Sequence, residues 1–276
     1  MSLLKFANIA KSFPGVRALD GVSFGVAEGT VHALMGENGA GKSTLLKILS
    51  GVYRPDGGEI RLAGQARQFR APVEAFQAGI AVIYQELHLA PDMTVAENLF
   101  LGHMPHHAGW LDNGAMRAAA REQLMALEED IDPDTKVGRL PIAQRQMLEI
   151  AKALLRDAKV IAFDEPTSSL SDREVRKLFG IIRRLREQGK AILYVSHRME
   201  EIFEVCDAVT VLRDGRHVET FDSMSKVNHD VLVNRMVGRD IKDIYHYSPT
   251  DRKRRPGARI KIQEGLCQVF FCPSHC

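Results

Sequence analysis

The sequence predicts an α/β protein in which helices cover a largely parallel sheet. Short apolar segments of strand character alternate with helical segments over much of the chain. A glycine-rich loop lies between one of these strands and a helix, and a second apolar strand ends in two acidic residues. Parallel pairing is favoured because the helical connections return the chain to the same end of the sheet.

Three segments near the start of the chain have the pattern of strands: 3–8, 21–26 and 31–35. A helix is predicted from Lys42, because three leucines then recur on one face. They are Leu45, Leu46 and Leu49. Gly51 is expected to end this helix, since glycine is common just past a helix C-terminus.

The middle of the chain, from about residue 86 to 155, is predicted to be mainly helical and follows a buried strand at 81–84. Thr94 and Glu97 have the spacing of a capping box, in which each side chain bonds the backbone N–H of the other residue. One helix of this segment is therefore expected to begin just after Thr94.

The pattern then returns to strands alternating with helices. Strands are expected at 160–163, 191–195 and 209–212, and a helix of about 172–187 ends before Gly189. The composition changes near Pro249, where 251–257 is a basic run that we interpret as a solvated tether rather than a nucleic-acid patch. We expect one domain over 1–247, followed by a linker and an irregular tail over 248–276.

Length and charge limit the classes of protein. A chain of 276 residues suits one large domain or two modest ones. A net charge of +2 is too small to argue for nucleic-acid binding. No apolar run approaches the roughly 18 residues of a membrane span, and the N-terminus lacks the apolar core of a secretory signal. We expect a cytoplasmic location, with any membrane attachment made through partners.

Cysteines and histidines raise two metal alternatives. The cysteines are Cys206, Cys267, Cys272 and Cys276. Cys206 is expected to be buried and inert. The other three could bind zinc with His275, but their spacing is irregular. The spacing of His103, His106 and His107 also resembles that of metal ligands, but they lie in a loop with glycine and proline, and we interpret them as solvated histidines.

The strongest motif is G-x-x-x-x-G-K-[ST], located between a predicted strand and a predicted helix. It consists of Gly36, Glu37, Asn38, Gly39, Ala40, Gly41, Lys42 and Ser43. Its glycines let successive backbone N–H groups point at phosphate oxygens, and the following helix adds its positive N-terminal dipole. Lys42 is expected to bind the β- and γ-phosphates of ATP, Ser43 to bind Mg²⁺, and Thr44 to bond the α-phosphate region.

A second motif completes this site. The apolar strand 160–163 ends in Asp164 and Glu165. Asp164 is expected to hold Mg²⁺ through water, while Glu165 lies one residue further, where a carboxylate can polarise an attacking water molecule. Without the phosphate loop, such an acid pair would more often be a solvated strand end.

With these motifs the sequence resembles the ATP-binding subunits of ABC transporters over about residues 3–247. The resemblance implies a P-loop NTPase cassette with an N-terminal β subdomain and a helical subdomain at about 86–155. It also implies that Gln85 contacts Mg²⁺ and the attacking water, that His197 contacts the γ-phosphate, and that Phe13 stacks on adenine. Taken singly, Gln85 or His197 would carry little weight, and it is their order and spacing that support these roles.

Within this family the chain resembles bacterial monosaccharide importers, and two segments favour the arabinose type. They are 131–135 and 161–171. The resemblance implies work with a transmembrane sugar permease at the cytoplasmic face of the inner membrane, and indirectly with a periplasmic sugar-binding protein. No nucleic-acid partner is expected. In this family the sugar is selected by the other components, so the sugar rests on analogy alone.

Two segments depart from the family pattern. The signature Leu-Ser-Gly-Gly-Gln is matched by Leu140, Pro141, Ile142, Ala143 and Gln144. Pro141 lacks a hydroxyl and a backbone N–H for the γ-phosphate held by an opposite cassette, and Ala143 replaces a glycine where backbone approaches phosphate. The helix is expected to begin near Gln144. The segment 168–171 ends in serine where the family usually has aspartate.

Importers of this type usually carry two cassettes, but here there is one phosphate loop. We expect the second cassette to come from a missing half or a second copy of this chain. The segment after Gly265 fits neither cassette nor linker, which favours a truncated or frame-shifted second half. The alternatives are a catalytically weak ATP-binding partner, supported by the altered signature, and a non-transport ABC ATPase acting on ribosomes or DNA, which the low net charge disfavours.

Overall fold

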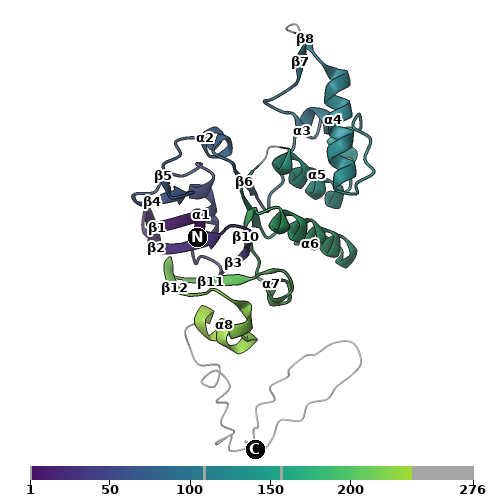
Figure 1. Cartoon of the computed structure of the whole chain (residues 1–276). Helices are drawn as coiled ribbons and strands as arrows, with labels where there is room; N and C mark the ends of the chain where they lie inside the picture. Colours follow the sequence, from purple (N-terminus) through teal and green to yellow (C-terminus); the bar gives the residue numbers. More distant parts are fainter. Residues whose placement is uncertain (1, 108–109, 156–157, 238–276) are drawn as a thin grey trace, which may run out of the picture. The chain divides into compact units, whose positions relative to one another are not determined.

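The structure is a computed structural model that describes residues 2–107, 110–155 and 158–237 (Figure 1). The chain divides into a compact unit, Met1–Arg239, and a second unit, Asp240–Cys276, which lies outside the described residues. The basic run 251–257, the tail after Gly265 and its cysteines therefore also lie outside them.

A six-stranded sheet forms the centre of the compact unit. Its order is β12 (Arg216–Phe221), β11 (Ala208–Arg213), β3 (Val31–Met35), β10 (Ala191–Val195), β9 (Val160–Asp164) and β6 (Ile80–Ile83). All neighbours pair in parallel except β11 and β12, which are antiparallel. The predicted α/β class with a mostly parallel sheet is confirmed.

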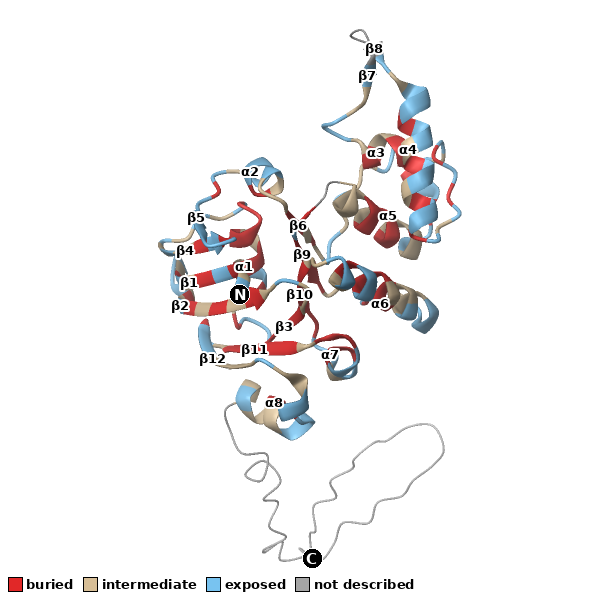
Figure 2. Cartoon of the chain, viewed as in Figure 1, coloured by how far each residue is buried: buried red, intermediate tan, exposed pale blue. Residues whose placement is uncertain are grey.

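The central strands are buried along their whole length. Every residue of β3, β9 and β10 is buried (Figure 2). Alternate residues of β10 face two different hydrophobic clusters. Tyr194 lies in the cluster with helices α5 (Ile142–Leu154), α6 (Asp172–Glu187) and α7 (Met199–Val205), and Val195 lies in the cluster with α1 (Lys42–Leu49). A strand covered on both faces needs apolar side chains on both, which is why these runs are continuous rather than alternating.

A second, antiparallel sheet packs beside the first. Its order is β2 (Val16–Ala27), β1 (Ser2–Phe13), β4 (Gly57–Leu62) and β5 (Gln65–Arg67). It shares its hydrophobic cluster with α1 (Lys42–Leu49), whose Leu45, Leu46 and Leu49 are fully buried. The predicted strands at 3–8 and 21–26 are confirmed as parts of longer strands, and the predicted helix from Lys42 is confirmed.

The remaining helices and short strands surround the sheets. They are α2 (Pro72–Gln77), α3 (Val95–Leu99), β7 (His106–His107), β8 (Trp110–Leu111), α4 (Asn113–Ala126), the 3-10 helix η1 (Val137–Arg139), α5 (Ile142–Leu154), α6 (Asp172–Glu187), α7 (Met199–Val205), the 3-10 helix η2 (Met224–Lys226) and α8 (His229–Val237). Residues 86–155 are mainly helical as predicted, but they also contain the hairpin of β7 and β8. The capping box of Thr94 and Glu97 is present at α3. Within the described residues, no helix combines the length and apolar character needed to cross a membrane.

Candidate active site

The register of the parallel strands brings the sequence motifs to one edge of the sheet. Val195 of β10 pairs with Leu34 of β3 on one side and with Asp164 of β9 on the other. The phosphate loop, the acid pair and His197 each follow one of these three strands. Their meeting point is therefore fixed by strand pairing, at the carboxyl edge where open α/β sheets bind ligands.

The phosphate loop, residues 36–43, contains glycines whose backbone conformation other residues rarely adopt. Gly41 precedes α1 with φ of 100°, in the left-handed region. A methyl group on Gly41 would lie 2.6 Å from the carbonyl oxygen of Ala18. Gly39 is also left-handed, with φ of 85°, but a methyl group there would meet nothing within 4 Å. The loop thus needs glycine for its conformation at both positions and for close packing at Gly41.

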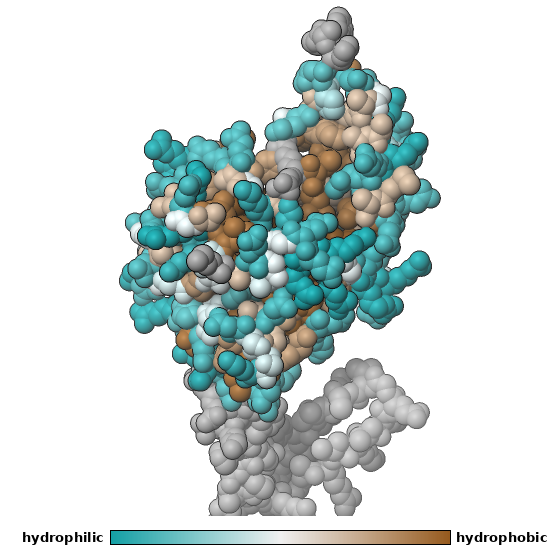
Figure 3. All heavy atoms as spheres, in the orientation of Figure 1, coloured by the Kyte–Doolittle hydropathy of each residue, from teal (hydrophilic) through white to brown (hydrophobic). Residues whose placement is uncertain are grey.

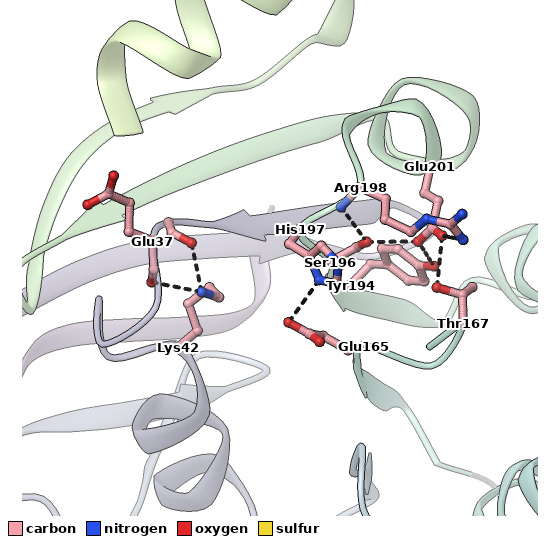
Figure 4. A network of polar contacts seen from close by, with 10 residues as sticks. Glu37, Lys42, Glu165, Thr167, Tyr194, Ser196, His197, Arg198 and Glu201 are labelled. Atoms are coloured by element: carbon pink, nitrogen blue, oxygen red, sulfur yellow. Dashed lines mark hydrogen bonds and ion pairs between the residues drawn. The ribbon is translucent and has the colours of Figure 1, made fainter. Parts of the chain in front are cut away.

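Lys42 points back into the phosphate loop (Figure 4). Its Nζ donates to the carbonyl oxygens of Gly36, at 2.7 Å, and of Glu37, at 3.0 Å. The residue is only 8% exposed. Burial lowers the pKa of Lys42, while the charges of Glu165 and Asp164 raise it. A cation is therefore held at the concave side of the loop, where phosphate oxygens would compete favourably with neutral carbonyls.

Asp164 provides oxygen ligands next to the loop. Burial first, and then the charge of Glu165, raise its pKa, and a hydrogen bond with Ser43 acts in the opposite direction. Ser43, Asp164 and Gln85 line one cavity of about 290 Å³. Hydroxyl, carboxylate and amide oxygens are ligands that Mg²⁺ accepts, so these three predicted metal-binding residues fit that ion.

Glu165 and His197 form a pair at the mouth of the site (Figure 4). His197 Nδ1 lies 3.2 Å from Glu165 Oε1. Glu165 has φ of 48°, in the left-handed region, and its backbone N–H donates to the Val195 carbonyl at 2.9 Å. A non-glycine residue in this region costs about 1–3 kcal/mol, and such conformations gather at functional sites. The structure thus brings together two of the three predicted catalytic residues, while Gln85 lies in the cavity with Asp164.

Phe13 lies at the end of β1, and its described neighbours are not residues of the phosphate loop. Its ring packs edge-on against Tyr53, with 5.3 Å between ring centroids. Tyr53 in turn lies under Lys47, whose Nζ is 5.5 Å from the ring centroid, and Lys47 lines the cavity of Ser43 and Gln85. Neither Tyr53 nor Lys47 was predicted to lie near the site, because a single aromatic residue in a loop and a lysine in α1 form no motif.

The signature segment, Leu140 to Gln144, lies at the start of α5. Pro141 is the N-cap residue and makes no capping hydrogen bond with a side chain. The helix begins at Ile142, so the expected start near Gln144 is wrong by two residues. The reason is that proline favours the position before or within the first turn, where its missing N–H costs nothing. The free N–H groups of the first turn therefore include those of Ile142 and Ala143.

Ser171 has a structural role in place of the family's aspartate. Its backbone N–H and its hydroxyl both donate to the Glu174 carboxylate, each at 2.7 Å. Ser171 is the N-cap residue of α6, so the departure from the family pattern preserves a helix cap.

The zinc alternative of Cys267, Cys272, Cys276 and His275 lies outside the described residues, and the histidine alternative can be compared with them only in part. Among them, no three His, Cys, Asp or Glu side chains come together as a metal site. His103 packs edge-on against Phe76, with centroids 6.2 Å apart. Cys206 is buried, and burial raises the pKa of its thiol. Its predicted burial is confirmed.

This combination of fold and motifs is shared with a known family. A family model described as "ABC transporter" matches residues 19–168. The chain belongs to this family, and its structure is that of an ATP-binding cassette. A nucleotide-free ATP-binding cassette from an ABC transporter matches with a TM-score of 0.73 and 26% identity, over 87% of this chain and 96% of that one. The ADP conformation of another cassette matches with a TM-score of 0.74 and 27% identity, over 87% and 100% of the two chains.

Curated relatives are more similar in sequence. The arabinose import ATP-binding protein of Pseudomonas fluorescens is 62% identical over 263 residues, which are 95% of this chain and 50% of that protein. The protein of the same name from Chromohalobacter salexigens is 58% identical over 251 residues, 91% of this chain and 50% of that protein. The chain therefore spans about half the length of the curated relatives it matches.

Proposed function

We propose that the chain binds ATP with Mg²⁺ at the phosphate loop and hydrolyses it. The observation that carries this proposal is the convergence of Lys42, Asp164 and the Glu165–His197 pair at one edge of the sheet. The buried lysine supplies a positive charge for the β- and γ-phosphates, and the loop N–H groups supply further donors. The residues from Gly36 to Thr44 form the binding cradle, and Phe13 supports the adenine ring.

The two carboxylates of the acid pair, Asp164 and Glu165, have different tasks in this proposal. Asp164, with Ser43 and Gln85, holds Mg²⁺, which neutralises phosphate charge when bound. Glu165 lies one residue further and orients the attacking water. His197, at 3.2 Å from Glu165, contacts the γ-phosphate from the next strand. This assignment separates metal binding from water activation.

A second cassette completes the site. A dimeric ATP-binding cassette bound to ADP and Pi matches this chain with a TM-score of 0.69 and 26% identity, over 79% of this chain and 97% of that one. We propose that ATP on Lys42 is closed by a signature segment from another cassette, either a second half of a longer protein or a second copy. The segment Leu140–Gln144 serves the partner's nucleotide in the same way.

The names of the relatives support coupling to arabinose import. We propose that the cassette energises a transmembrane sugar permease at the cytoplasmic face of the inner membrane, with a periplasmic binding protein delivering the sugar. Residues 86–155 form the helical subdomain of a domain over 1–247, and this subdomain docks on the permease. On the face shown in Figure 3, hydrophobic side chains gather over its helices. Its exposed large apolar residues include Leu101, Leu111 and Met125, and such residues suit a contact surface.

The test is the turnover of Glu165→Gln. Glutamine keeps the shape of the side chain but is a much weaker base, so we expect unchanged Mg-ATP affinity and turnover reduced by at least about 100-fold. Glu187→Gln, an exposed site at the end of α6, is the matched control. Turnover of Glu165→Gln within about two-fold of wild type would mean that another group acts as the catalytic base.

A weak ATP-binding partner is the second candidate, and one observation favours it. Pro141 is the N-cap residue of α5, so the signature has lost one donor to phosphate. Measuring turnover beside nucleotide affinity on the wild-type chain separates the two functions. Tight binding with no turnover under conditions that pair the cassettes would support the partner role.

A further inference from the structure

A buried carboxylate next to the proposed site has no part in the roles assigned so far. Glu201 lies in α7 and is only 5% exposed. It accepts four side-chain hydrogen bonds (Figure 4). The donors are Thr167 at 2.8 Å and Arg198 at 3.0 Å on Oε1, and Tyr194 at 2.9 Å and Ser196 at 2.8 Å on Oε2. We call these five residues the Glu201 cluster.

The cost of burying this charge is offset only by such pairing. A buried carboxylate without partners would cost several kcal/mol, but here Arg198 supplies the opposite charge and three hydroxyls supply further donors. Burial and the charge of Glu201 both raise the pKa of Tyr194, so its hydroxyl stays protonated and donates. The cluster is a fully paired network, which fixes geometry more strictly than apolar contacts do.

The hydrogen bonds of the Glu201 cluster connect the segment that follows Glu165 with the residues on either side of His197. Ser196 and Arg198 flank His197 in the chain, and the Arg198 N–H also donates to the Ser196 hydroxyl at 3.0 Å. Thr167 lies two residues after Glu165. The side chain of His197 is itself 63% exposed, so burial does not fix its position. Its loop is held through its neighbours.

We propose that Glu201 is a positioning residue, which holds the segments of Glu165 and His197 at the separation needed for ATP hydrolysis. This inference rests on the proposed roles of those two residues. None of the hydrogen bonds given above for the cluster goes to the phosphate loop, so nucleotide binding should depend on it little. Turnover should depend on it strongly, because a shift of about 1 Å in a reacting group can cost up to about 100-fold in rate.

The test compares Glu201→Gln with Glu200→Gln, which alters an exposed carboxylate on the same helix. The glutamine amide nitrogen cannot accept the hydrogen bonds that one carboxylate oxygen accepted. We expect kcat to fall at least about 10-fold in Glu201→Gln, with KM and Mg-ATP affinity within about two-fold of wild type. A kcat equal to that of Glu200→Gln, or an equal loss of affinity and kcat, would overturn the proposal.

A double variant separates this inference from the proposed function. In a His197→Ala background, Glu201→Gln should lower kcat by less than it does in the wild type, because its action through His197 is already lost and only its action on the segment of Glu165 remains. If His197→Ala alone keeps wild-type turnover, the proposed role of His197 fails. If His197→Ala loses turnover while Glu201→Gln keeps it, the positioning role alone fails.

Amide hydrogen exchange gives a readout that needs no turnover. We expect faster exchange over residues 196–198 in Glu201→Gln than in Glu200→Gln, with unchanged exchange in the phosphate loop. Equal exchange over 196–198 would contradict the proposal. If Glu201→Gln does not fold, Ser196→Ala removes a single donor, leaves the carboxylate paired with Arg198, and should change exchange and kcat in the same direction.

Discussion

The glycines of the phosphate loop show how a single residue can be limited by conformation, by space or by both. Gly39 and Gly41 share left-handed φ values, 85° and 100°, but only Gly41 touches other backbone closely. The carbonyl of Ala18, in β2, occupies the position that a side chain on Gly41 would need. The loop is therefore shaped partly by the antiparallel sheet behind it.

Alanine substitutions separate these two limits. We expect Gly39→Ala to lower the free energy of unfolding by about 1–2 kcal/mol, the cost of a left-handed alanine. We expect Gly41→Ala to lower the free energy of unfolding by the same amount and by about 1–3 kcal/mol more, because the added methyl group would crowd the carbonyl of Ala18. Urea unfolding of both variants checks this. Equal losses would show that the close approach to Ala18 relaxes at no cost.

Individual residues of the site differ in how far they could be predicted from the sequence. Lys42 and Asp164 could be predicted as site residues because a lysine and an acid in these motifs have defined tasks next to phosphate. Glu201 was missed, because one of its donors, Thr167, lies 34 residues away in the chain and reaches it only when β9 and β10 pair in the folded sheet. For an acidic residue on a short helix, no local sequence pattern tells whether its side chain is buried and hydrogen-bonded or exposed to solvent.

At the scale of elements, the strands and helices with local signals were predicted well. The strands β3, β9 and β10 are continuous apolar runs, and α6 has a cap at its start and Gly189 after its end. The strand β12 was missed although Asp214 and Gly215, both with positive φ, form the two-residue turn that joins it to β11. The hairpin of β7 and β8 was missed because two-residue strands are too short to show a pattern.

The capping box of α3 makes the stability of this element depend on pH. Hydrogen bonds from Thr94 lower the pKa of Glu97 below its ordinary value of 4.5. A lowered folded-state pKa stabilises the protein above the unfolded-state pKa, and this contribution is lost as pH falls below about 4.5. We expect Thr94→Ala to lose about 1 kcal/mol at pH 7 and less at pH 3. Unfolding of both proteins at the two pH values checks this, and an equal loss at both would contradict it.

At the scale of the whole molecule, the proposed function requires a second cassette. The signature segment and the phosphate loop belong to different elements, α5 and the β3–α1 connection. The described side-chain hydrogen bonds of Arg145, next to the signature, go to the carbonyls of Leu140 and Gly138 within the helical part. This separation suits a signature that acts on the nucleotide of another cassette.

Restoring two residues of the family signature should strengthen pairing. We expect Glu165→Gln to remain largely monomeric with saturating ATP, because Pro141 and Ala143 offer few donors. Adding Pro141→Ser and Ala143→Gly returns a hydroxyl, an N–H and room for close approach, so the dimer fraction with ATP should rise several-fold. Light scattering after size exclusion measures it, with ADP as the control. A full ATP-dependent dimer without these changes would contradict the expectation.

The central claim is that Lys42 holds the phosphates of ATP, and a titration with a fluorescent ATP analogue tests it most directly. Removing one partner of a buried, hydrogen-bonded charge pair costs about 2–5 kcal/mol. At about 1.4 kcal/mol for each factor of ten, Lys42→Ala should weaken Mg-ATP binding at least about 30-fold. Lys5→Ala, an exposed lysine on β1, should leave affinity unchanged. Equal affinities of wild type, Lys5→Ala and a folded Lys42→Ala would contradict the account.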